Sequence, residues 1–295
     1  MDSSLLVNYV FNVFLSYTAT MLNIITIRAL RKTSSLPKNL KTLLLSLAVS
    51  DLGVGFLVHP LYVVSLVMKL KGDPTTIAFF TQKAFHFMGI ILGFASFFAV
   101  TALTADRFLT LQLHLRYQEL VTYKRVVSVV MSIWAISAFF SILDQFYGEI
   151  MYFVKGTLSP VLFILSAFFY YKMFLAVRRH RNQIQDLQLQ QQEQNVEETT
   201  TAAKLRKSMV GTFYVYLVFL AYYLPYMLVN IVRTVKTTSL TDTLSYYALT
   251  LVFLNSSLNP LVYCWKMRQI RPAIRDILQN ILPITDKEGP WKIER

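Results

Sequence analysis

The chain has 295 residues, of which 55% are hydrophobic and only 15% are charged. This composition is too apolar for a soluble domain of this length, so it predicts a protein that lies largely in a lipid bilayer. The formal net charge of +13 falls almost wholly between the apolar segments. That pattern favours basic loops of a membrane protein over a nucleic-acid-binding surface, so no nucleic acid is expected as a partner.

Seven mainly apolar segments follow one another along the chain. A helix needs about 20 such residues to cross a bilayer. The spans are therefore predicted at about 4–28, 40–68, 80–111, 124–143, 154–180, 204–234 and 242–265. No basic region and cleavage site precede the first segment, so we expect it to act as its own insertion signal. The sequence thus predicts an all-α membrane protein, a seven-transmembrane helix bundle within residues 1–280.

Loop charge predicts the orientation of these spans, because Lys and Arg accumulate on the cytoplasmic side. One set of alternating loops has six of the 29 basic residues, namely Lys69, Lys71, Lys83, Lys155, Arg233 and Lys236. The other 23 lie in the opposite set, so the N-terminus is expected outside and the C-terminus in the cytoplasm. The Gln-rich stretch 178–207 is then a cytoplasmic loop. Residues 266–279 alternate basic and apolar, which predicts an amphipathic helix on the inner leaflet before a short tail, 281–295.

Polar residues inside apolar spans are costly and therefore informative. Asp51 lies in the second span and Arg107 follows Asp106 at the inner end of the third. Further polar residues at comparable depth to Asp51 are Asn23, Ser96, Asn255, Ser256 and Asn259. Three interpretations remain open for the Asp51 group: ordinary hydrogen bonds between helices, a protonated Asp in a hydrogen-bond network, or an oxygen-lined pocket for a monovalent cation. The Asp106-Arg107 pair alone also fits a simple snorkelling pair.

The order and spacing of several motifs resemble the rhodopsin-like (class A) G-protein-coupled receptors over nearly the whole chain. The matching residues are Asn23, the run 47–52 ending in Asp51-Leu52, Asp106-Arg107-Phe108, Trp134, Tyr222-Tyr223-Leu224-Pro225 and Asn259-Pro260-Leu261-Val262-Tyr263. The residues 170–176 and 115–117 look most similar to melanocortin receptors, whose branch of the family also includes the adenosine, cannabinoid and lysophospholipid receptors. The resemblance implies a plasma-membrane receptor that is not an enzyme.

The family resemblance also implies roles for individual residues. The residues of the activation switch, where a heterotrimeric G protein couples and arrestin can also bind, would be Asp106, Arg107, Tyr170, Tyr223, Pro225, Asn259, Pro260 and Tyr263. Sodium, as an allosteric ion and in the absence of any other cofactor, would bind Asp51, Ser96, Asn255, Ser256 and Asn259.

Several departures from the family pattern bear on the ligand. The single cysteine, Cys264, leaves no disulfide at the outer end of the third span, where Gln82 stands. Gly89 replaces the aspartate that binds amines, and the seventh span has no lysine for retinal. The outer pocket is predicted to contain Tyr62, His86, Gly89, Phe146, Tyr223, Met227 and Phe253. This largely neutral, aromatic set favours a lipid or a small apolar extracellular ligand.

Two other classes of function compete with this interpretation. In an ion-coupled secondary transporter, Asp51 would carry the ion, but the inverted repeats and paired broken helices typical of transporters are not evident. A receptor-like protein that no longer signals would explain Tyr223 and Phe108 in place of the family's usual Trp and Tyr. No spacing of His, Cys, Asp and Glu suggests a metal centre or a catalytic site.

Overall fold

A computed structural model shows a bundle of helices. It describes residues 3–72, 75–113, 116–148, 160–172, 216–233, 238–267 and 269–281, with residues 150, 154, 157, 158, 174, 175, 178, 214 and 236 between them. The labelled helices are α1 (Ser3–Lys32), α2 (Lys38–Gly53), the π-helix η1 (Val54–Val58), α3 (His59–Lys71), α4 (Thr76–Leu113), α5 (Tyr117–Leu120), α6 (Tyr123–Phe146), α9 (Ser239–Lys266) and α10 (Arg271–Ile281). Helical stretches at Pro160–Lys172 and Tyr216–Arg233 lie between α6 and α9. Most of the predicted loop 178–207 and the tail 282–295 fall outside the described residues.

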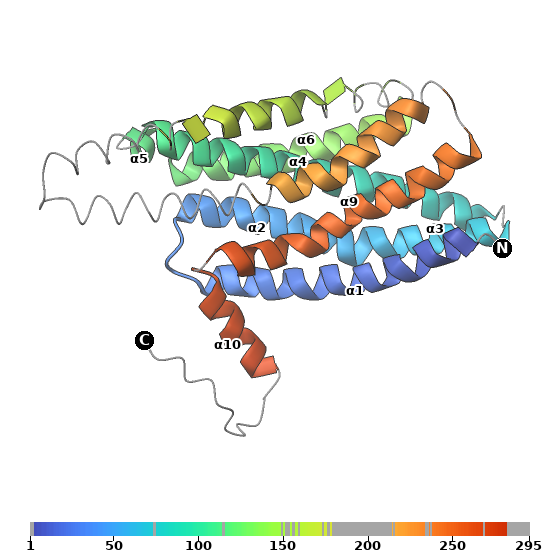
Figure 1. The fold of residues 1–295 in the computed structure, drawn as a ribbon, viewed down its shortest axis with the longest axis horizontal. Helices are drawn as coiled ribbons and strands as arrows, with labels where there is room; N and C mark the ends of the chain where they lie inside the picture. Colours follow the sequence, from blue (N-terminus) through green and yellow to red (C-terminus); the bar gives the residue numbers. More distant parts are fainter. Residues whose placement is uncertain are drawn as a thin grey trace, which may run out of the picture.

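The long helices run side by side, and α10 turns away from them where α1 ends (Figure 1). Among the described residues, five helices are long and apolar enough to cross a membrane: Leu5–Lys32, Lys38–Met68, Thr76–Thr110, Tyr123–Phe146 and Tyr216–Arg233. Pro160–Lys172 is apolar but shorter. The 28-residue α9 has the required length and carries the polar residues of the seventh predicted span. This is the helical membrane bundle that the sequence predicts.

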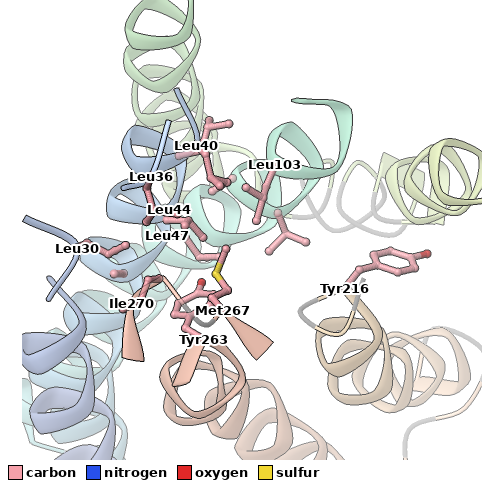
Figure 2. Packing of buried hydrophobic residues seen from close by; sticks show 14 of the residues in the cluster. Leu30, Leu36, Leu40, Leu44, Leu47, Leu103, Tyr216, Tyr263, Met267 and Ile270 are labelled. Atoms are coloured by element: carbon pink, nitrogen blue, oxygen red, sulfur yellow. The ribbon is translucent and has the colours of Figure 1, made fainter. Parts of the chain in front are cut away.

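The main apolar core lies in the half of the bundle that holds the end of α1 and the start of α2. Figure 2 shows Tyr263 and Met267 packed near Leu30 and Leu47, with Tyr216 on a separate helix. Leu30, Leu44 and Leu47 are fully buried although much of the outer surface is apolar. The interior side chains therefore fix which helix faces turn inward, whereas the outward apolar faces suit lipid.

The second predicted span contains a π-turn that joins α2 to α3. The backbone N–H of His59 bonds to the carbonyl of Val54, five residues earlier. In the same register the next residue, Pro60, has no N–H to give to the carbonyl of Gly55. The Ser16 hydroxyl of α1 donates to that carbonyl at 2.8 Å instead. Gly55 allows this approach, because a Cβ there would lie 2.8 Å from the backbone nitrogen of Thr20.

The amphipathic helix begins at Arg271 rather than at Lys266, where the sequence pattern placed its start. The reason is that α9 continues to Lys266, and Met267 then leaves the helical conformation with φ −100° and ψ 89°. The guanidinium of Arg271 donates to the last carbonyls of α9, those of Cys264 at 3.1 Å and Trp265 at 2.8 Å. Ile270 and Ile274 are buried against the main core, so α10 is anchored at its first turn.

Candidate functional site: two buried polar centres

The first polar centre surrounds Asp51 in the middle of the bundle. Asp51 is fully buried, and Asn259 of α9 donates to its Oδ2 at 2.8 Å. Ser96 of α4 donates to Oδ1 at 3.3 Å and lies 2.9 Å from the Ser50 hydroxyl. Three helices distant in sequence therefore meet at one carboxylate. The predicted cluster of Asp51, Ser96 and Asn259 is brought together, and Ser50 is a member that the sequence did not single out.

Asn255 and Ser256 lie beside this carboxylate on α9. Both are buried, and the Ser256 side chain lies near enough to the Asp51 carboxyl group to act on it. The amide oxygens of Asn255 and Asn259 are buried and have no hydrogen-bond partner among the described residues. Oxygen atoms are the ligands that hard cations prefer. The donor set thus fits a monovalent cation, with the Asp51 carboxylate as the compensating charge and the two amide oxygens as free acceptors.

Asn23 ties α1 to this centre through the kink in α9. Pro260 lies inside α9 and lacks the N–H that would bond to the carbonyl of Ser256. The Asn23 side chain donates to that carbonyl at 2.8 Å and to Ala19 of its own helix at 2.8 Å. Asn23 is fully buried. Its amide therefore replaces the missing helical hydrogen bond and fixes α1 beside the kink.

The second polar centre is the Asp106-Arg107 pair near the C-terminal end of α4. Both residues are nearly fully buried, and the guanidinium of Arg107 forms an ion pair with Asp106. The Arg107 Nε lies 3.1 Å from Oδ2 of Asp106. Tyr117 of α5 donates to the other carboxylate oxygen, Oδ1, at 2.5 Å. The Arg107 side chain is thus held by an acid that is itself held from the opposite side.

Tyr117 and Asn39 complete this inner centre, and the sequence pattern did not assign either residue to it. Asn39 of α2 lies 3.5 Å from the Tyr117 hydroxyl and donates to the carbonyl of Val121 at 2.7 Å. Burial and the hydrogen bond to Asp106 raise the pKa of Tyr117, so its hydroxyl stays protonated and available as a donor. A tyrosine eleven residues after an acid gives no helical spacing, so one sequence offers no signal for this contact.

Two tyrosines assigned to the switch lie in different surroundings. Tyr170 accepts a hydrogen bond from Thr104 at 3.2 Å, and its ring lies 4.6 Å from that of Tyr216. Tyr263 is fully buried in the main core, and its hydroxyl has no hydrogen-bond partner among the described residues. Arg107 is therefore paired with Asp106 while both tyrosines are packed between helices, an arrangement with the arginine held.

Tyr223 lies in an aromatic group that joins its helix to α4. Its ring stacks on Phe219 at 4.4 Å and lies 5.7 Å from Phe97 of α4. The hydroxyl approaches Gly93 closely enough that a Cβ there would lie 3.5 Å away. Pro225 follows within the same helix, Tyr216–Arg233, and Met227 packs against the main core. The Tyr223 hydroxyl thus points toward Gly93 of α4, and its ring packs against Phe97 and Phe219.

The outer aromatic cluster contains some of the predicted pocket residues. Tyr62 lies 5.3 Å from Phe85 and 5.4 Å from Phe253, measured between ring centroids. Phe85, which the sequence pattern did not single out, is buried in this cluster. The neighbouring His86 is exposed, and the centroid of its ring lies 5.2 Å from that of Phe85. Phe146 is 76% exposed at the end of α6. A Cβ at Gly89 would meet only Val58, at 3.8 Å. The structure therefore gathers Tyr62, Phe85 and Phe253, and leaves Phe146 apart.

Comparison with known proteins supports one family. The model described as "7 transmembrane receptor (rhodopsin family)" matches residues 22–156 and 145–263. The chain is similar to adenosine receptor A2b of Gallus gallus, at 23% identity over 90% of this chain and 86% of that protein. It is also similar to melanocortin receptor 5 of Pan troglodytes, at 26% identity over 87% of this chain and 79% of that protein. Adenosine receptor A2a of Canis lupus familiaris is 22% identical over 80% of this chain and 63% of that receptor.

Proposed function

Because the chain belongs to the rhodopsin family of seven-transmembrane receptors, we propose that it binds an extracellular or membrane-derived ligand and activates a heterotrimeric G protein. The observation that carries this proposal is the buried Arg107, held by Asp106, which Tyr117 in turn holds. A buried guanidinium is retained at considerable electrostatic cost. Such a group, positioned at the end of α4 expected in the cytoplasm, is well placed to be released toward a partner.

The proposed switch exchanges the partners of Arg107. In the resting arrangement its charge is neutralised by Asp106. When Asp106 releases it, the guanidinium would gain hydrogen-bond partners in Tyr170 and Tyr263, whose helices must approach α4. Pro260 interrupts the hydrogen-bond ladder of α9, which carries Tyr263, and Pro225 interrupts that of the helix Tyr216–Arg233, so both helices have a place to bend. Tyr223 would transmit a ligand-induced shift, because it packs against Phe97 of α4.

A sodium ion is proposed to favour the resting state by binding at Asp51. The ion would supply positive charge to a buried carboxylate, and Ser96, Asn255 and Asn259 would provide neutral oxygens. An ion held between α2, α4 and α9 stabilises the conformation that has this spacing, by mass action. Movement of α9 during activation would separate Asn259 from Asp51 and weaken the site.

The ligand is proposed to be a lipid or another small apolar molecule. The outer aromatic cluster of Tyr62, Phe85 and Phe253 is neutral and largely apolar. The similar receptors are named for two different ligand classes, adenosine and melanocortin. Their identities to this chain are close to one another, so the similarity favours neither ligand. The composition of the cluster therefore decides the proposal.

The chain is proposed to lie in the plasma membrane with its N-terminus outside, as the loop charges predict. Arrestin is a second proposed partner at the cytoplasmic end. The transporter alternative has less support, because the family is one of receptors. A receptor-like protein that does not signal would give no G-protein dissociation with any ligand, so Arg107→Ala would change nothing in it.

The test is G-protein dissociation measured in cells that express the full chain, screened with lipid, nucleotide and peptide libraries. We expect a ligand-dependent signal that Arg107→Ala reduces at least tenfold. Lys124→Ala is the matched control, because Lys124 is an exposed cation near the same end of the bundle, and it should retain the signal. A signal that survives Arg107→Ala at equal surface expression would contradict the proposed switch. Solute uptake that depends on Asp51 would favour the transporter.

A further inference from the structure

A third group of buried polar residues joins α1, α3 and α9 on the outer side of the Asp51 centre. Asn8 and Asn12 of α1 both donate to the hydroxyl of Thr250 in α9, at 2.9 and 3.0 Å. Tyr62 of α3 donates to the side-chain oxygen of Asn8 at 3.3 Å. All four side chains are at most 3% exposed. Two side-chain amides at membrane depth on one helix are costly unless they are paired. Their hydrogen bonds across three helices therefore offset this cost and join α1, α3 and α9.

Asn12 lies opposite His59 in the packing of α1 against the second span. Ser16 contacts Gly55, and about two turns farther along each helix Asn8 contacts Tyr62 of α3. The two contacts run in opposite directions along the chain, so the helices are antiparallel. Asn12 lies midway between Asn8 and Ser16, and His59 lies between Gly55 and Tyr62. The register thus places the side chains of Asn12 and His59 at one level of the interface.

The unpaired polar atoms of this interface gather at that level. The side-chain oxygen of Asn12 and both ring nitrogens of His59 are buried and have no hydrogen-bond partner within the described part of the chain. His59 is 0% exposed, and its ring lies 4.8 Å from that of Phe253 in α9. A buried polar group without a partner is destabilising, and native proteins satisfy most such groups with protein atoms or ordered water. Three unpaired atoms at one level therefore point to a bound molecule.

We propose that Asn12 and His59 hold internal water between α1, α3 and α9. Water can donate to the Asn12 oxygen and to the bare imidazole nitrogen, and it can accept from the imidazole N–H. A cation would meet no carboxylate in this group of Asn8, Asn12, His59, Tyr62 and Thr250, so its desolvation would be uncompensated. Neutral, bifunctional water matches both the polarity and the mixed donors and acceptors of the site.

The water site has a structural consequence for the outer half of the bundle. It extends the hydrogen-bonded contact between α1 and the second span from Asn8 and Tyr62 of α3 down to Ser16 and Gly55 of η1. Without it, this interface would have polar contacts at two levels separated by an unsatisfied one. The inference rests on the packing alone and is independent of which ligand or G protein the receptor binds.

Water in the site is tested directly by X-ray hydroxyl-radical labelling of the wild-type protein in detergent, read by mass spectrometry. Radicals form from ordered water, so buried side chains beside it are oxidised. We expect oxidation of His59 and Phe253 although Phe253 is 5% exposed. Phe219 is the matched control, because it is 2% exposed among aromatic rings, and it should remain unmodified. Equal, background labelling of Phe253 and Phe219 would overturn the proposal.

A double-mutant cycle of Asn12→Leu and His59→Leu tests whether the two residues share the water. Each single variant leaves its partner unsatisfied, so we expect the loss of thermal stability in the double variant to be roughly half the sum of the single losses. A remote pair, Asn12→Leu with Trp134→Phe, should be additive. Additive losses for Asn12 and His59, or a gain in stability from either single variant, would contradict a shared water. A non-additive loss of stability for Asn12 and His59 without oxidation of His59 and Phe253 would indicate a direct hydrogen bond between Asn12 and His59. That result would also overturn the proposed water site.

Discussion

Asn23 carries a hydrogen bond that the α9 backbone lacks, and removing it tests how the kink at Pro260 is tolerated. In wild-type, the amide of Asn23 donates to the Ser256 carbonyl at 2.8 Å. The variant Asn23→Ala leaves that carbonyl in a site from which solvent is excluded, because Ser256 is 4% exposed. The second bond of the amide, to Ala19, is within α1, where the carbonyl also has a helical partner. The loss therefore falls mainly on Ser256.

The expected magnitude follows from two known ranges. Hydrogen bonds between membrane helices contribute on average about 0.6 kcal/mol and at most about 1.7 kcal/mol. A buried group left without its partner costs about 1–3 kcal/mol. We therefore expect Asn23→Ala to lower the free energy of unfolding by about 1–2 kcal/mol. At roughly 2–4 °C per kcal/mol, the midpoint of thermal unfolding should fall by roughly 2–8 °C.

The assay follows thermal unfolding in detergent with a thiol-reactive fluorophore, which reports on Cys264, the one cysteine of the chain. The informative comparison uses Pro260→Ala, which restores an N–H in helical register with the Ser256 carbonyl. In that background Asn23→Ala should lower the midpoint by less than half as much as in wild-type. Equal losses in the two backgrounds would show that Asn23 acts through side-chain packing and not through the unpaired carbonyl.

Three further predictions concern close packing, the inner ion pair and the sodium site. Gly55→Ala should destabilise the protein by about 1–3 kcal/mol in the same assay, because a Cβ would lie 2.8 Å from the backbone of α1, whereas Gly148→Ala meets nothing within 4 Å and should be neutral. Tyr117→Phe removes the donor to Asp106, so ligand-independent G-protein dissociation should rise about fivefold, equivalent to about 1 kcal/mol; unchanged basal signalling would refute this. Sodium chloride should raise the unfolding midpoint of wild-type above that in choline chloride, and Asp51→Asn should abolish the difference; a sodium-specific shift that persists in Asp51→Asn would refute the assignment.

The sequence predicts the Asp51 centre better than any other part of the protein. A carboxylate in an apolar span must face the interior, and the polar residues of other spans at comparable depth are its natural partners. This reasoning predicted Ser96 and Asn259, and the structure brings both to Asp51. It did not separate Ser50 from the other serines, because a serine can equally bond to its own helix. Ser50 in fact also donates to the carbonyl of Leu47 at 2.8 Å.

The inner centre was predictable only in its covalently adjacent part. Asp106 and Arg107 are neighbours in sequence, so their pairing needs no knowledge of the fold. Tyr117 reaches Asp106 because the chain leaves α4 and re-enters a short helix, α5. That path depends on loop geometry, which hydrophobic periodicity does not encode. The same limit applies to Arg271, whose side chain ends α9 and thereby moves the start of α10.

Asn12 and His59 show why buried polar residues in the outer half were harder to assign. Asn12 lies in the first span, where the sequence pattern singled out only Asn23, and His59 precedes a proline, where a polar residue has an ordinary local explanation. Their significance arises only from the π-turn at Val54–Val58, which shifts the face that follows it by an extra residue. Because that extra residue rotates α3 relative to α2, Asp51 and His59 can both face the interior, one toward α4 and α9 and the other toward α1 and α9. A regular helix through the same sequence would change the facing of His59, Tyr62 and the outer cluster together.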